Sequence, residues 1–179
     1  MIQNCNNYRV LKVFLDNPTK GFGLREISRK IKLGLPSVSN YIKELKKESL
    51  ILEKKVNEIR LWIANREKEK FKKRKIADKL IEIEDSGMLD FLDEKLSFPC
   101  VILFGSCSLG EDIETSDIDL CILSEIKKEP DLKEFEKYLN KGIQIFLFDK
   151  RGFQKLKDKN KELYNNIING IVLRGRLNG

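Results

Sequence analysis

Near the middle of the 179-residue chain, a Gly-Ser pair follows an apolar run, and a pair of aspartates comes twelve residues later. The apolar run Cys100–Phe104 is short and continuous, and it predicts a buried strand that delivers Gly105 and Ser106 to its carboxyl end. There a glycine lets a phosphate approach the backbone, and a serine hydroxyl with neighbouring N–H groups can donate to phosphate oxygens. Alone, the Gly-Ser pair is weak support for a phosphate site, because Gly-Ser is common in turns.

The aspartates belong to a second strand pattern, in which Asp117 and Asp119 alternate with isoleucine and leucine. On a strand of period two, both carboxylates project from one face, a few ångströms apart. Like charges this close repel each other unless they are compensated, and a hard divalent cation that also binds nucleotide phosphates is the usual compensation. The alternative is a strand edge with two solvated aspartates, and the Gly-Ser pair at this spacing disfavours it.

Gly105-Ser106, ten residues, and then Asp117-Ile118-Asp119 resembles the motif of the nucleotidyltransferase superfamily that includes DNA polymerase beta, in particular its minimal nucleotidyltransferases. The resemblance covers Phe98 to the C-terminus. It implies a mixed sheet with helices on one side. It also implies that Gly105 and Ser106 hold a nucleoside triphosphate and that Asp117 and Asp119, as catalytic residues, bind Mg²⁺.

Active members of this superfamily usually carry a third acidic residue on a later strand, where it completes the metal site and serves as a base. In this chain the candidate strand is Gly142–Asp149, and the position between Ile143 and Ile145 is Gln144. A neutral amide oxygen can coordinate a cation but cannot act as a general base near neutral pH. We therefore expect nucleotide binding with weak or absent catalysis.

The segments around this motif predict further elements. A helical region over residues 76–96 is expected to be divided at Gly87. Asp149 is expected to cap a helix over residues 152–169 rather than to serve as the third acidic residue. It is an odd number of positions from Gln144, so on a strand its side chain would project from the opposite face. Residues 171–173 are expected to form a terminal edge strand.

Composition limits the possible functions. The chain has no histidine, and its four cysteines show no CxxC spacing, which excludes a zinc site and any mechanism based on histidine. No stretch of 18 apolar residues and no signal-like segment occurs, so we expect a cytoplasmic protein with reduced thiols and no role at a membrane. Cys107 lies inside the expected phosphate loop and is interpreted as a small filler.

The charge is unevenly distributed. Residues 1–80 contain 21 Lys and Arg against 9 Asp and Glu, whereas residues 81–179 contain 14 against 19. A basic first half joined to an acidic second half indicates two modules, the first with a polyanionic partner. Composition alone would equally allow solvated lysine-rich helices.

The order of the predicted elements in the first half favours a polyanionic partner over solvated helices. Apolar spacing predicts helices over residues 8–15, 24–31 and 37–47, with Pro36 opening the third, and two β-prone runs over residues 50–63 predict a hairpin. This order, and the sequence LREISRKIKLGLPSVSNYIKELKKESLI, resembles the winged helix-turn-helix of prokaryotic transcription regulators over residues 6–65.

The resemblance implies contacts with double-stranded DNA. The exposed residues of the third helix are expected to face the major groove: Ser37, Ser39, Asn40, Lys43 and Lys47. Four further basic residues are expected to contact phosphates: Arg25, Arg29, Lys54 and Lys55. The alternative is a winged helix used only for dimerisation or protein contact.

Together these observations predict an α+β protein with three parts: a winged helix-turn-helix over residues 1–65, a helical linker over 66–97 and a nucleotidyltransferase-like domain over 98–179. The favoured function is a DNA-binding transcription regulator, as a possible homodimer, that binds a Mg²⁺-nucleotide. The first alternative is an active nucleotidyltransferase that modifies a small molecule or a partner toxin, as antitoxins of this kind do. The second is a regulator whose transferase fold only supports oligomerisation.

Overall fold

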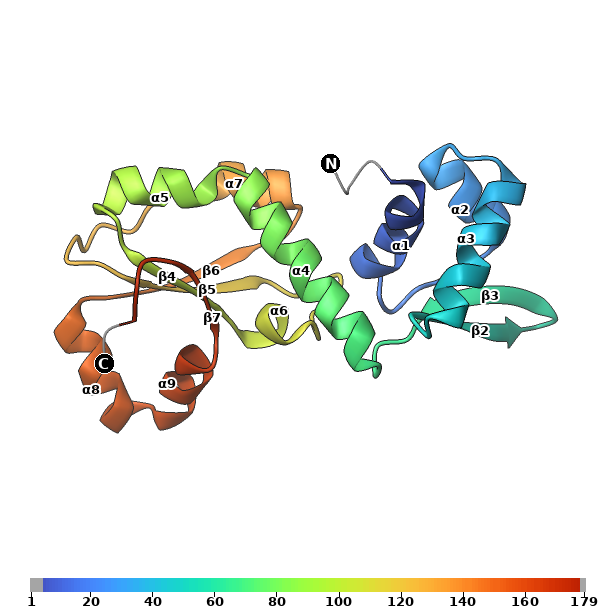
Figure 1. The fold of residues 1–179 in the computed structure, drawn as a ribbon. Helices are drawn as coiled ribbons and strands as arrows, with labels where there is room; N and C mark the ends of the chain where they lie inside the picture. The colour runs from blue at the N-terminus through green and yellow to red at the C-terminus, as the bar shows by residue number, and fades with distance from the viewer. Residues whose placement is uncertain (1–4, 178–179) are drawn as a thin grey trace. The chain divides into compact units, whose positions relative to one another are not determined.

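The computed structural model describes residues 5–177 and divides the chain into two compact units, Met1–Lys75 and Ile76–Gly179. The division falls inside helix α4 (Glu69–Asp85), so this helix contributes to both units (Figure 1). None of the helices in the described part of the chain is long and apolar enough to cross a membrane.

The first unit combines three helices with a small antiparallel sheet. The helices are α1 (Asn6–Asp16), α2 (Leu24–Ile31) and α3 (Leu35–Lys47). The strands are β1 (Gly21–Phe22), β2 (Ile51–Val56) and β3 (Ile59–Ala64), in the order β1-β3-β2. The helices and the hairpin lie where the sequence predicts them. The two-residue strand β1 was not predicted, because it is too short to show a period.

Helix α3 shows why these residues fold as they do. Pro36 lies in its first turn, where a missing backbone N–H costs nothing. Val38, Ile42 and Leu45 recur at a spacing of three and four and are buried in the core of the unit with Phe14. The opposite side of the helix therefore remains exposed to solvent.

The second unit is built on a four-stranded mixed sheet. Its strands are β4 (Cys100–Phe104), β5 (Ile118–Leu123), β6 (Ile143–Phe148) and β7 (Ile171–Arg174), in the order β6-β5-β4-β7. Strands β5 and β6 are parallel, and the other pairs are antiparallel. The predicted terminal edge strand is thus confirmed as β7.

Helices cover both faces of this sheet, contrary to the expectation of helices on one side (Figure 1). Val101 and Leu103 pack with α5 (Met88–Leu96) and the region of α7 (Lys133–Leu139), whereas Ile102 and Phe104 pack with α8 (Lys150–Lys159) and α9 (Lys161–Ile168). The continuous apolar run of β4 already contains the reason, because a strand without alternation is buried on both faces.

Helix boundaries follow their local signals. Gly87, with φ of 74°, separates α4 from α5, as predicted. Asp149 caps α8 by accepting a hydrogen bond from the Gly152 N–H at 2.6 Å, also as predicted. The prediction of a single helix over residues 152–169 is wrong. Asn160 interrupts it and caps α9 by accepting a hydrogen bond from the Leu163 N–H.

Candidate nucleotide site

The Gly-Ser pair lies where β4 ends and the short helix α6 (Gly105–Leu109) begins. Gly105 has φ of 67°, in the left-handed region that favours glycine. The Asp119 carboxylate lies so close to Gly105 that a Cβ atom at this position would overlap Asp119 Oδ2. Position 105 therefore requires glycine both for its backbone conformation and for the space occupied by Asp119.

The two aspartates lie at the start of β5, beside this turn. Asp119 is half-buried and pairs with Phe104 of β4, whereas Asp117 immediately precedes β5 and is exposed. The Asp117 carboxylate lies against Gly142, where a Cβ atom would overlap Asp117 Oδ1. Gly105 at the start of α6 and Gly142 just before β6 thus leave room for the two carboxylates that the sequence singles out.

Lys141 fixes the loop that leads to Asp117. The side chain is 12% exposed, and its Nζ donates to the carbonyls of Ile113 at 2.7 Å and Ser116 at 3.0 Å. The same atom lies 3.4 Å from Oδ2 of Asp112. Residues 112–116 are therefore held at both ends by one ammonium group.

Two further contacts hold Asp117 in place. The Ile118 N–H donates to the carbonyl of Gly142 at 2.8 Å, which ties β5 to the turn before β6. The buried Cys107 thiol donates to the Asp117 carbonyl at 3.4 Å, so Cys107 links α6 to this aspartate in addition to filling space.

Gln144 is the residue of β6 that pairs with Asp119 in the parallel β5-β6 register. Paired residues of neighbouring strands project from the same face, so Gln144 and Asp119 lie on one side of the sheet. Gln144 is exposed.

Negative charge accumulates at this end of the sheet. Burial, followed by the charge of Asp117, raises the pKa of the Asp119 carboxyl above its ordinary value. Within the described residues, neither aspartate forms an ion pair with a lysine or arginine. The donor set is thus two uncompensated carboxylates with an amide beside them, and hard oxygen ligands of this kind suit Mg²⁺.

The residues predicted to contact DNA all lie in the first unit. The structure places Ser37, Ser39, Asn40, Lys43 and Lys47 on α3, and of these only Ser39 is half-buried, the others being exposed. Arg25 and Arg29 lie exposed on α2, which packs against α3. Lys54 and Lys55 lie exposed on β2.

Sequence reasoning missed Lys141 and Gly142. Both precede β6 by one or two positions, and no local pattern in the sequence distinguishes them from an ordinary turn. Their roles depend on contacts with a loop about 25 residues earlier in the chain.

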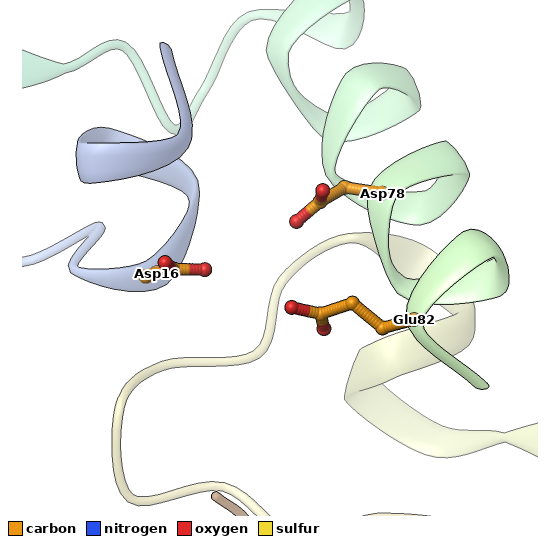
Figure 2. Close-up of side chains that lie close together, drawn as sticks. All are labelled: Asp16, Asp78 and Glu82. Atoms are coloured by element: carbon orange, nitrogen blue, oxygen red, sulfur yellow. The ribbon is translucent and has the colours of Figure 1, made fainter. Parts of the chain in front are cut away.

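Other carboxylates lie close together on α4. Figure 2 shows Asp78 and Glu82 one turn apart, with both side chains directed to the same side of the helix. Asp16, also drawn there, belongs to α1 of the first unit, so these three residues are not a site of either unit.

Comparison with known proteins bears on the second unit. No curated protein matches the chain. Residues 88–176 match the family described as "Polymerase beta, Nucleotidyltransferase". This range includes Gly105, Ser106, Asp117, Asp119 and Gln144. The second unit therefore contains a nucleotidyltransferase-like domain of the polymerase beta superfamily.

Proposed function

We propose that the second unit binds a nucleoside triphosphate together with Mg²⁺ and that the first unit binds double-stranded DNA, so that the protein is a nucleotide-responsive transcription regulator of the cytoplasm. One observation carries the nucleotide part: two uncompensated carboxylates lie beside the Gly105-Ser106 turn within a domain of the polymerase beta superfamily.

Each residue has a distinct role in this proposal. Asp117 and Asp119 hold Mg²⁺, and the turn at Gly105 and Ser106 holds the phosphates. When bound, the cation neutralises phosphate charge and polarises the phosphoryl oxygens. Lys141 does not touch the ligand, because its ammonium is engaged by the loop carbonyls and Asp112.

Catalysis is expected to be weak or absent because of Gln144. A hydroxyl that attacks a phosphoryl group must lose its proton, and neither oxygen nor nitrogen of a carboxamide accepts one near neutral pH. Gln144 lies in register with Asp119, so a carboxylate at this position would complete a group of three.

Transfer from radiolabelled ATP to the protein itself or to added hydroxyl compounds tests this point. The rate of transfer by the unmodified chain should be negligible, and Gln144→Glu and Gln144→Asp should each raise it by at least tenfold. Gln154→Glu, at an exposed position on α8, should leave the rate unchanged. A clear rate in the unmodified chain that is lost in Asp119→Asn would instead support the alternative, an active nucleotidyltransferase acting on a partner toxin or a small molecule.

The DNA part of the proposal is supported by charge and exposure. The first 80 residues contain 21 Lys and Arg against 9 Asp and Glu, and lysines lie on the solvent side of α3 and on β2. Lys43 and Lys47 are one turn apart, so they extend from one side of α3. Such an arrangement suits the phosphates that flank a groove, and a homodimer would bind two half-sites.

A further inference from the structure

A cavity of about 560 Å³ lies in the second unit, at the opposite end of the sheet from the nucleotide site. It is bordered by Cys100 and Leu123, which pair at the start of β4 and the end of β5. Phe104 and Asp119 pair at the other end of these strands, four residues away. At about 3.3 Å per residue, the cavity is therefore roughly 13 Å from Asp119 along the sheet.

The walls of the cavity are largely apolar and come from several elements. Leu96 and Phe98 contribute from the end of α5 and the turn that follows, and Phe153 of α8 contributes with Tyr164 of α9. The rings of Phe153 and Tyr164 lie 5.3 Å apart. The volume falls within the range of about 300–1,000 Å³ that is typical of small-molecule sites.

Two neighbouring residues that line the cavity have an unusual backbone conformation. Ser97 and Phe98 are consecutive non-glycine residues with φ of 56° and 58°, and Phe98 is 83% exposed. Hydrogen bonds fix this turn: the Phe98 N–H donates to the Asp93 carbonyl, and the Ser124 hydroxyl donates to the Leu96 carbonyl. Strained backbone that is held in this way is concentrated at functional sites such as ligand clamps.

The charged residues of the cavity determine the kind of ligand. Lys150 and Arg176 line it and form no ion pair within the described residues, whereas Glu125 is the acidic residue in the lining. Two cations against one carboxylate leave one positive charge beside an apolar, aromatic wall. We propose that this cavity binds a small amphipathic monoanion, with its ring or short apolar body against Phe153 and Tyr164 and its anionic group at Lys150 and Arg176.

The probe for this proposal is 8-anilinonaphthalene-1-sulfonate, an aromatic monoanion whose fluorescence rises in apolar sites. Titration into the full chain should show one saturable site. Lys150→Gln combined with Arg176→Gln should weaken binding at least tenfold, and Gln154→Trp, at an exposed lining position on α8, should block the cavity. The matched control is Arg151→Gln with Lys155→Gln, because these exposed cations of the same helix do not line the cavity.

Two comparisons separate this site from others. The neutral analogue N-phenyl-1-naphthylamine should bind the Lys150→Gln, Arg176→Gln variant as well as it binds the unmodified chain. Asp117→Asn with Asp119→Asn should leave sulfonate binding within twofold, because the nucleotide site is elsewhere. The proposal would be overturned by equal weakening in the Arg151, Lys155 control, by unchanged binding in Gln154→Trp, or by failure of the aspartate variant to bind the probe.

Discussion

At the residue scale, Gly105 and Gly142 make matched substitutions informative. Gly105→Ala places a Cβ atom at positive φ and against Asp119, and it should destabilise the protein by about 1–3 kcal/mol in urea unfolding. Gly142→Ala meets only the end of the Asp117 side chain, so it should change the free energy of unfolding by less than about 1 kcal/mol.

Both substitutions should weaken Mg²⁺ binding, because each displaces one of the two carboxylates. Gly23→Ala is the control, since a Cβ atom there meets nothing within 4 Å. If Gly142→Ala bound Mg²⁺ normally, the assignment of Asp117 as a ligand would be wrong.

The pKa of Asp119 leads to a prediction about pH. Burial and then the charge of Asp117 raise this pKa in the folded state above the ordinary value of 3.8, so the folded state binds the proton more strongly than the unfolded state does. The stability that protonation of Asp119 contributes to the folded state is therefore fully present below pH 3.8, and it is lost as the pH rises through the folded-state pKa. In the absence of divalent cations, Asp119→Asn should therefore be more stable than the unmodified protein at pH 7, and the difference should disappear below pH 3.8.

Urea unfolding in EDTA between pH 3 and pH 8 measures this difference. Asp158→Asn, at an exposed position on α8, is the control for the removal of a carboxylate outside the site. An Asp119→Asn variant that is less stable than the unmodified protein at pH 7 would contradict the described electrostatics.

At the element scale, the loop between α6 and β5 depends on Lys141. Lys141→Met removes the ammonium that joins the partly buried carbonyls of Ile113 and Ser116 to Asp112, so these acceptors lose the hydrogen bonds and the charge that Lys141 supplies. We expect a decrease of about 1–3 kcal/mol in stability and about tenfold weaker Mn²⁺ binding, measured by electron paramagnetic resonance.

Two variants make the Lys141 prediction specific. Lys141→Arg should restore most of the Mn²⁺ affinity, because the arginine guanidinium retains the positive charge and the hydrogen-bond donors. Lys137→Met, at an exposed position on α7, should change neither property. Equal Mn²⁺ affinity in Lys141→Met and the unmodified protein would show that the loop does not position Asp117.

Whether a feature of the fold or of the site could be predicted from the sequence depends on how far apart its interacting residues lie along the chain. The turn at Gly105 and the strand that carries Asp119 have local signals, and they were predicted. The break at Asn160 was missed, because apolar spacing continues on both sides of it while the deciding cap is a single side-chain hydrogen bond. Lys141 could not be predicted, because its three partners lie 25 to 29 positions away and only the tertiary structure brings them together.

At the scale of the whole molecule, the two units are proposed to bind different ligands. Binding of the first unit to double-stranded DNA should weaken steeply with salt, because each lysine that neutralises a phosphate releases condensed counterions. Replacing Lys43, Lys47, Lys54 and Lys55 by Gln should make the slope of log K against log salt shallower, by about one unit for each of these lysines that neutralises a phosphate.

Fluorescence anisotropy with a labelled duplex at several salt concentrations provides the measurement. The control replaces four exposed lysines of the second unit by Gln: Lys133, Lys137, Lys155 and Lys157. A slope near zero for the unmodified chain, or the same slope in both variants, would indicate that the first unit binds protein instead.

The most direct test of the central claim is calorimetric titration of ATP, GTP, CTP and UTP with Mg²⁺ into the unmodified chain and into Asp117→Asn with Asp119→Asn. We predict one site for at least one of these nucleotides in the unmodified chain and affinity at least a hundredfold lower in the double variant. If no nucleotide binds the unmodified chain, or if both proteins bind it equally, the site described at Gly105, Ser106, Asp117 and Asp119 is not a nucleotide site.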